Sequence, residues 1–115
     1  MRRVHASHVS RVLASAGCDR GRVEPSSRGN ANYYTPGFVV KGSRQAWETG
    51  LVDDHERDAG CVTVERMELN SHGATAGPGQ DVAAYAAVLR DAGFQVETRT
   101  RSTGRQHLVL RGRSS

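Results

Sequence analysis

Two stretches of the chain place apolar side chains at the spacing of a single helical face. Apolar residues recur there at i, i+3, i+4 and i+7, which predicts two amphipathic helices. Each stretch ends at an Ala-Gly pair, and Gly17 and Gly93 stand where a helix often ends in a left-handed residue. We expect Ser7 to cap the first helix and one of residues 79–81 to open the second. The apolar positions are Val9, Val12, Leu13 and Ala16 in the first stretch, and Val82, Tyr85, Ala86 and Leu89 in the second.

A second pattern, strict alternation of apolar and polar residues, follows the second predicted helix. It runs over residues 94–101 and is typical of a β-strand. Residues 102–105 have the composition of a turn, and residues 106–111 are expected to return as a strand with Leu108 and Leu110 facing inward. Two further strands are predicted in the first half of the chain, over residues 38–41 and 61–69.

The first half therefore looks like a looser copy of the second, and the Ala-Gly junctions strengthen that likeness. We predict an α+β fold in which two helix–strand–strand units form an antiparallel sheet of four or five strands, with two helices on one face. Residues 1–115 are expected to form a single domain, with a pseudo-repeat over residues 7–69 and 80–112 and a flexible connector over residues 70–79. Residues 19–36 are expected to be mainly loop. The pattern of residues 43–60 is ambiguous, because residues 45–48 could pair as a strand or form one turn, and residues 53–60 are predicted to be an acidic loop.

Composition adds a strong bias toward arginine, with fifteen arginines and one lysine, Lys41, among 115 residues. The net charge of +4 and the pI of about 9.7 would ordinarily suggest a nucleic-acid partner. Arginine also has GC-rich codons, and isoleucine is absent, so genome composition can account for most of the excess, and the sequence alone does not tell codon bias from function. The charge is nevertheless unevenly placed, at +4 over residues 1–30, −3 over residues 31–70 and +3 over residues 71–115.

The basic residues of the last predicted hairpin are the candidate binding residues. If Leu108 and Leu110 face the helices, alternation places the arginines of both strands on the opposite face, which we expect to be open. A sheet face with several guanidinium groups can hold phosphates, and two tyrosines in the polar loop could stack on single-stranded bases or simply pack at a strand entry. The predicted nucleic-acid-binding residues are Arg99, Arg101, Arg105, His107, Arg111, Tyr33 and Tyr34.

The remaining chemistry-bearing residues match no catalytic or metal-binding pattern. Cys18 and Cys61 form no CxxC pair, and the acidic run that contains His55 lacks the glycine and terminal glutamate of a calcium loop. We therefore expect no metal site, no cofactor and no enzymatic activity. With no apolar run of bilayer-spanning length and no signal-peptide pattern, we expect a cytoplasmic protein without a membrane partner.

Two resemblances rest on the second helix and the hairpin. The run Leu-Arg-Asp-Ala-Gly-Phe at 89–94, followed by a basic strand and His107, resembles the start of HicA-type mRNA interferases, which implies a dsRBD-like fold and a catalytic histidine. In that family a Gly-Ser precedes the histidine, whereas Gly104-Arg105-Gln106 precedes His107 here. The whole pattern of helix, Ala-Gly and strand pair is similar to that of small uncharacterised proteins of high-GC actinobacteria and their phages, which implies a fold and no activity.

The sequence thus leaves three classes of function open. We expect a non-catalytic accessory or regulatory binding protein, with DNA or RNA bound through the basic C-terminal hairpin. The alternative is a protein-interaction or homodimeric module of a phage or mobile element, formed through a strand edge or through the polarised charge. A HicA-like ribonuclease is a remote third.

Overall fold

A computed structural model describes residues 3–25, 32–67 and 81–113 of the chain. Within these residues, no helix has the length and apolar character needed to cross a membrane. The helices and strands, in chain order, are α1 (Ala6–Ser15), β1 (Arg22–Pro25), β2 (Asn32–Thr35), β3 (Gly37–Lys41), α2 (Ser43–Glu48), α3 (Asp54–Asp58), β4 (Val62–Met67), α4 (Val82–Asp91), β5 (Phe94–Thr100) and β6 (Gln106–Arg113).

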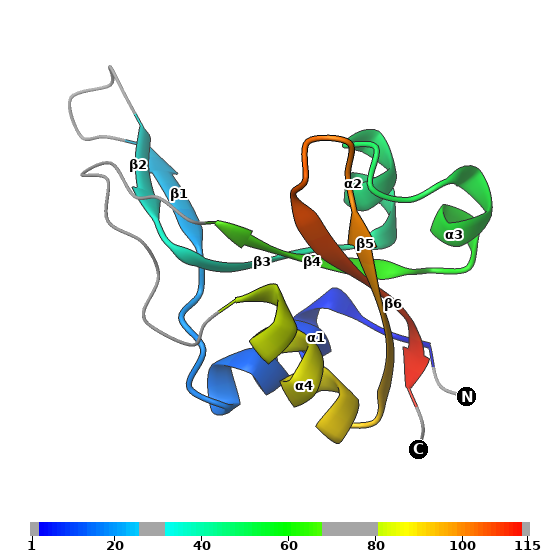
Figure 1. Ribbon diagram of the computed structural model, residues 1–115, viewed down its shortest axis with the longest axis horizontal. Coiled ribbons are helices and arrows are strands. Elements are labelled where there is room, and N and C mark those ends of the chain that lie inside the picture. The colour runs from blue at the N-terminus through cyan, green and yellow to red at the C-terminus, as the bar shows by residue number, and fades with distance from the viewer. Residues whose placement is uncertain (1–2, 26–31, 68–80, 114–115) are drawn as a thin grey trace.

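The centre of the molecule is a four-stranded antiparallel sheet with the strand order β3-β4-β6-β5 (Figure 1). Strands β4 and β6, which come second in the two helix–strand–strand units, pair at the centre, and β3 and β5 form the edges. The units α1-β3-β4 and α4-β5-β6 thus occupy equivalent places on either side of the β4–β6 pair. The predicted α+β fold with its four-stranded sheet is confirmed. The predicted connector over residues 70–79 lies outside the described residues.

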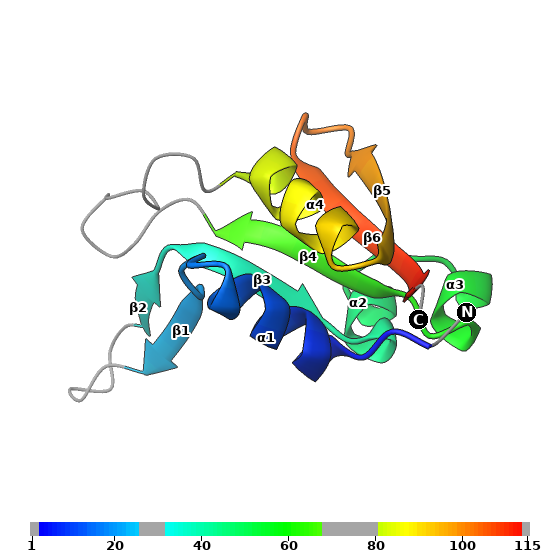
Figure 2. The same ribbon diagram turned by 90° about the horizontal axis from the view of Figure 1, so that it is seen from below.

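One face of the sheet is covered by α1 and α4, which lie side by side (Figure 2). The predicted apolar face of α4 is buried at all four positions. In α1, Val9 and Leu13 are buried, Val12 is half-buried and Ala16 is exposed, so the apolar face of each helix packs on the sheet largely as the sequence indicates. Phe38 of β3 and Tyr85 of α4 meet edge to face at 6.1 Å in this core. Both helices end at a glycine of positive φ, Gly17 at 89° and Gly93 at 92°, as predicted. The core residues of this layer are Val4, Val9, Leu13, Phe38, Val62, Val64, Val82, Tyr85, Ala86, Leu89, Phe94, Leu108 and Leu110.

Helix starts follow the capping rules only in part. Asp81 caps α4, where its Oδ1 accepts a hydrogen bond from the backbone N–H of Ala84 at 2.8 Å. The prediction of Ser7 as the first cap is wrong, because α1 begins at Ala6, two residues earlier than a Ser7 cap implies, and its N-cap is His5, without a side-chain hydrogen bond.

The other face of the sheet carries a second, smaller layer made of α2 and α3. Residues 43–60 therefore contain two short helices, and the predicted acidic loop contains α3. Trp47 of α2 donates a hydrogen bond from Nε1 to Asp54 Oδ1 at 2.7 Å, and Arg57 lies 4.4 Å from the centre of its ring. A small apolar cluster fixes this layer to the sheet, formed by Ala46, Leu51, Val52, Cys61 and Val109.

Strands β1 and β2 form a separate hairpin within the segment predicted to be mainly loop. The hairpin projects at the end of the molecule where β3 begins and β4 ends (Figure 1). The chain reaches β3 through a close contact, because the N–H of Phe38 donates to Asp19 O at 2.9 Å and the N–H of Gly21 donates to Phe38 O at 2.8 Å. The short polar strands of this hairpin carry no apolar alternation, which explains why the sequence pattern did not predict them.

Candidate nucleic-acid interface

The arginines predicted from the last hairpin do lie on the sheet face opposite α1 and α4. Arg99 of β5 is directly across from His107 of β6, and Leu108 and Leu110 point the other way into the helix-covered core. That face is only partly open, however, because Arg99 and Arg101 are half-buried there, whereas Arg111 is exposed. Helices α2 and α3 pack on it through the apolar cluster that includes Val109. We call this face, with Arg99, Arg101, His107 and Arg111, the covered face.

Two of its arginines are held by a buried carboxylate from α3. Arg99 grips Glu56 with both terminal nitrogens, Nη1 at 2.9 Å from Oε1 and Nη2 against Oε2, and Arg111 Nη2 lies 2.9 Å from the same Oε2. Glu97 bridges the two guanidinium groups, since its Oε2 accepts from Arg99 at 3.0 Å and from Arg111 at 2.7 Å. These contacts place two guanidinium groups between two carboxylates, so their charges are largely neutralised within the protein.

Glu56 is positioned to do this by the start of α3. Asp53 and Glu56 form a capping box, in which Asp53 Oδ1 accepts from the N–H of Glu56 at 2.8 Å and Glu56 Oε1 accepts from the N–H of Asp53 at 3.2 Å. Only 4% of Glu56 is exposed. The hydrogen bond from Arg99 lowers the pKa of Glu56 to about 2, against the opposing effect of burial.

The third arginine of the covered face, Arg101, is paired with Glu65 of β4. Lys41 of β3 donates to the other oxygen of Glu65 at 3.2 Å, so one carboxylate serves two cations. Burial lowers the pKa of Lys41, and repulsion from Arg101 and Arg105 lowers it further. The positive charges of Lys41 and Arg101 are thus also partly neutralised by a carboxylate within the protein.

His107 lies between these two ion-pair groups and is only 4% exposed. Burial lowers its pKa, and the charge of Arg101 adds to that effect, while the backbone of Leu51 opposes it. Neither ring nitrogen makes a well-aligned hydrogen bond to another described residue. The catalytic role that the HicA resemblance implies for this histidine remains a prediction.

Tyr33 and Tyr34 are placed in the small hairpin, where they pair with Glu24 and Val23. The sequence placed them in a loop, and β2 shows them to be strand residues. Their side chains lie outside what the structure describes. Arg105, the last of the predicted residues, is exposed in the turn before β6, and its Nη2 donates to the carbonyl of Arg66 at 3.0 Å.

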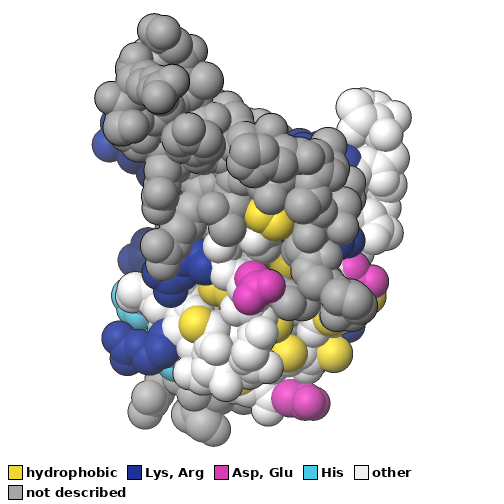
Figure 3. All heavy atoms as spheres, turned by 90° about the vertical axis from the view of Figure 1, so that its left-hand side faces the viewer, with side chains coloured by type: hydrophobic (Ala, Val, Ile, Leu, Met, Phe, Trp, Pro, Cys, Tyr) yellow, Lys and Arg dark blue, Asp and Glu magenta, His cyan; other side chains and the backbone are white. Residues whose placement is uncertain are grey.

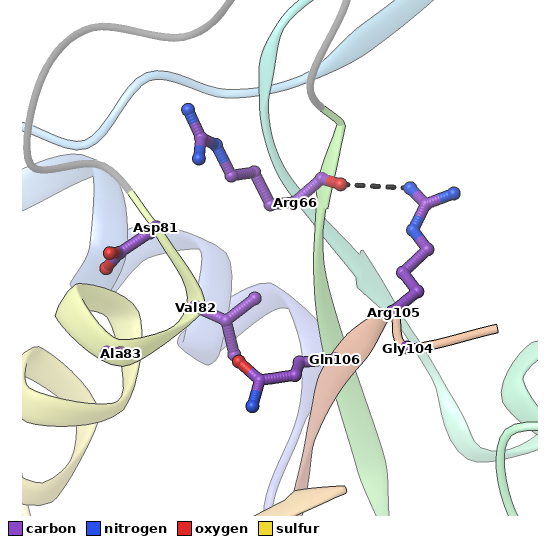
Figure 4. A pocket seen from close by; sticks show the side chains of 7 residues that line it. All are labelled: Arg66, Asp81, Val82, Ala83, Gly104, Arg105 and Gln106. Atoms are coloured by element: carbon purple, nitrogen blue, oxygen red, sulfur yellow. Dashed lines mark hydrogen bonds between the residues drawn. The ribbon is translucent and has the colours of Figure 1, made fainter. Parts of the chain in front are cut away.

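Arg66 was missed as a binding residue, although its position gives a signal. It follows Val62 and Val64 in the inward register of β4, which points an arginine toward the helix layer at the end of the strand. Figure 4 shows its side chain extending from β4 over the start of α4, while Arg105 reaches its carbonyl from the other side. The two arginines line a pocket of about 210 Å³ whose opposite wall includes Asp81.

Two more arginines continue this surface. Arg20 lies beside β3, with its guanidinium 5.9 Å from the ring centre of Phe38, which is the strand partner of Arg66. Arg11 of α1 shares a shallow polar depression with Arg20, together with three serines of the same helix. None of these four guanidinium groups has a carboxylate partner among the described residues. We call this set the open cluster: Arg11, Arg20, Arg66 and Arg105.

The open cluster lies at the end of the molecule that carries the small hairpin, whereas the acidic helix α3 lies at the other end (Figure 1). Figure 3 views the first of these ends, where Lys and Arg side chains lie at several places on the surface. Asp81 is the acidic side chain within the pocket itself, and its carboxylate is occupied by the helix cap. The uneven charge of the sequence is thus only partly a separation in space, because arginines of the last third also pair with Glu56 and Glu65 of the acidic middle third.

Comparisons with protein-family models, with curated proteins and with solved structures give no match. The resemblances drawn from the sequence therefore remain predictions. The described residues contain no group of three or more His, Cys, Asp or Glu side chains arranged to hold a metal ion. Both cysteines are free thiols, and burial raises the pKa of each.

Proposed function

We propose that the protein is a non-catalytic binding protein that contacts the phosphate groups of a nucleic acid through the open cluster. The observation that carries this proposal is the contrast in pairing. Arg99, Arg101 and Arg111 are matched by carboxylates, whereas the guanidinium groups of the open cluster have no carboxylate partner among the described residues. Of the hairpin arginines predicted from the sequence, only Arg105 belongs to the proposed site.

The chemistry of the cluster suits phosphate oxygens. A guanidinium group offers several donors in one plane and can bind a phosphate through two hydrogen bonds at once. Arg105 uses one nitrogen on a backbone carbonyl, which fixes its position and leaves its other donors available. Arg66 is half-buried and lines the same pocket as Arg105, so a phosphate in that pocket would lie beside both guanidinium groups.

The arrangement favours contacts with the backbone over the reading of base sequence. Contacts to phosphate position a protein on a nucleic acid and carry little sequence information. We therefore expect weak sequence preference and a strong dependence on salt, because each phosphate contact releases a counterion. A nucleic-acid ligand and two free thiols also suit a cytoplasmic protein.

The test is fluorescence anisotropy of labelled single- and double-stranded DNA and RNA, titrated over a range of salt concentrations. Arg66→Ala and Arg105→Ala should each weaken binding several-fold and reduce the slope of log K against log salt by about one. Arg44→Ala is the matched control, because Arg44 is an exposed α2 arginine paired with Glu48. It removes the same charge away from the open cluster.

The outcomes separate this proposal from its competitors. An equal loss of affinity in Arg44→Ala and Arg66→Ala would mean that binding follows net charge and not this surface. If Arg99→Ala/Arg101→Ala remains folded and loses more affinity than the open-cluster variants, the binding site lies on the covered face. Absence of binding at low salt would remove nucleic acid as the ligand.

A further inference from the structure

Strand β5 is an edge strand with a free outer side. It pairs with β6 on one side, and among the described elements no strand pairs with it on the other (Figure 2). The opposite edge of the sheet differs, because residues 19–21 lie against β3 there. That contact is so close that a Cβ on Gly37, whose φ is 148°, would lie 2.3 Å from the carbonyl oxygen of Asp19. The β3 edge is therefore partly closed, and the β5 edge is available.

The hydrogen-bonding direction of each β5 residue follows from the turn. The N–H of Arg101 donates to Arg105 O at 2.9 Å, so Arg101 faces β6. Backbone groups alternate between the two sides of an antiparallel strand, so Arg99 and Glu97 also face β6, and Thr98 and Thr100 face outward. An independent contact agrees, since the outward carbonyl of Val96 accepts a hydrogen bond from Arg90 Nη2 at 3.2 Å.

The side chains on this edge are complementary to themselves in one register. If two copies of β5 pair antiparallel about a two-fold axis at Thr98, each Thr98 exchanges both backbone hydrogen bonds with its counterpart. Glu97 of one copy then lies opposite Arg99 of the other, and the reverse contact follows by symmetry. Both side chains reach the surface, with relative exposures of 47% and 28%.

Neighbouring registers are unfavourable. An axis at Glu97 or at Arg99 places identical charges opposite each other, and an axis at Thr100 places Arg99 opposite Arg101. An axis at Val96 falls on the irregular register that the strand shows between Gln95 and Val96. The alternation of Glu97, Thr98 and Arg99 thus selects a single pairing.

We propose that two copies of the chain associate through β5 about a two-fold axis at Thr98 and join their four-stranded sheets into one continuous sheet. This inference goes beyond the proposed function and does not depend on it, because no residue of the open cluster lies on β5. An interface made from one strand pair is small, so the dimer is expected to be weak and to depend on concentration. Arg90 must release the carbonyl of Val96 when the strands pair.

The first test is sedimentation velocity of the full chain over a range of concentrations. The wild type should shift toward twice the monomer mass as the concentration rises. Thr98→Lys places two like charges at the axis and should raise the dimer dissociation constant by about tenfold or more. Thr98→Pro removes an outward N–H without removing a bond to β6, since proline is tolerated on edge strands. Thr103→Lys, in the exposed turn, is the matched control and should behave as the wild type.

Disulfide cross-linking is a second test, which does not depend on the folding of Thr98→Lys or Thr98→Pro. Residues paired by hydrogen bonds across an antiparallel ladder have Cα atoms about 5.5 Å apart, which suits a disulfide. Thr98→Cys should therefore form a cross-linked dimer with oxidised glutathione much faster than Thr103→Cys or the wild type. A wild type that stays monomeric at all concentrations would overturn the proposal. So would a dimer that survives both Thr98→Lys and Thr98→Pro, or equal cross-linking of the two cysteine variants.

Discussion

The covered face and the open cluster use the same side chain in opposite ways. On the covered face, Arg99 and Arg111 lie between Glu56 and Glu97, and Arg101 lies against Glu65. In the open cluster, the guanidinium groups have no carboxylate partner among the described residues, and Arg105 donates to a backbone carbonyl. The difference teaches that the number of arginines in a segment does not measure its affinity for phosphate. What counts is whether the fold brings a carboxylate to them.

The largest expected effect on stability comes from removing the carboxylate of Glu56, which pairs with two arginines of the covered face. Glu56→Gln keeps a side chain able to complete the capping box, but it leaves two arginines with half of their counter-charge. We expect a loss of about 2–4 kcal/mol in the free energy of unfolding, measured with urea. Glu48→Gln, which breaks an exposed pair with Arg44, should cost less than about 0.5 kcal/mol. If the two variants cost the same, the covered face is no more tightly paired than the surface.

The same variant also sharpens the functional comparison. Where the Glu56→Gln protein remains folded, Arg99 and Arg111 have lost part of their neutralisation. Its affinity for DNA at low salt should then rise above that of the wild type. No change in affinity would mean that α2 and α3 shield these arginines by covering them and not by pairing with them.

Lowering the pH is expected to reduce the free energy of unfolding by a slightly smaller amount. The folded pKa of Glu56, about 2, is below its value in the unfolded chain, so its stabilising effect is complete above about pH 4.5 and is lost as the pH falls toward 2. The folded pKa of His107 is also lowered, so its neutral burial begins to cost stability as the pH falls below about 6.5. Urea unfolding over this pH range should show a shallow decline followed by a steeper one. The steeper decline should amount to roughly 2–3 kcal/mol and be much reduced in Glu56→Gln.

A moderate change in DNA affinity is expected from removing the acidic side chain that lies in the pocket of the open cluster. Asp81→Asn removes a negative charge from the pocket of Arg66 and Arg105, and asparagine caps a helix about as well as aspartate. We expect affinity for DNA at low salt to rise about threefold, with stability changed by less than about 0.5 kcal/mol. Asp91→Asn, at the exposed end of α4, is the control and should have a smaller effect. Equal effects of the two changes would remove the pocket from the proposed site.

The smallest expected effect concerns a buried polar group that has no partner. The hydroxyl of Tyr85 is buried without a hydrogen-bond partner among the described residues, and burial raises the pKa of Tyr85 to about 12. Tyr85→Phe should therefore change the free energy of unfolding by less than about 0.5 kcal/mol, or increase it slightly. A loss above about 1 kcal/mol would reveal a hydrogen bond of this hydroxyl. Comparing Tyr85→Phe with Glu56→Gln therefore compares a buried polar group without a hydrogen-bond partner among the described residues with one that has several.

The sheet and its two long helices were predictable because their signals are local. Val9 and Leu13, or Leu108 and Leu110, repeat at the spacing of the element that contains them. Helices α2 and α3 were not, since elements of six and five residues are too short to show a period. The pairing of the arginines could not be predicted either. Glu56 lies 43 residues before Arg99, and no local pattern indicates that the two meet.

The separation between Glu56 and Arg99 also has a consequence for the order of events during synthesis. Helix α3 is too short to be stable alone, and the carboxylate that closes its cap is held by arginines from β5 and β6, which are synthesised after it. The segment over residues 43–60 should therefore stay unstructured on the nascent chain until β5 and β6 have emerged and paired. The layer of α2 and α3 then forms after the sheet, so a formed layer indicates that the four strands have already paired.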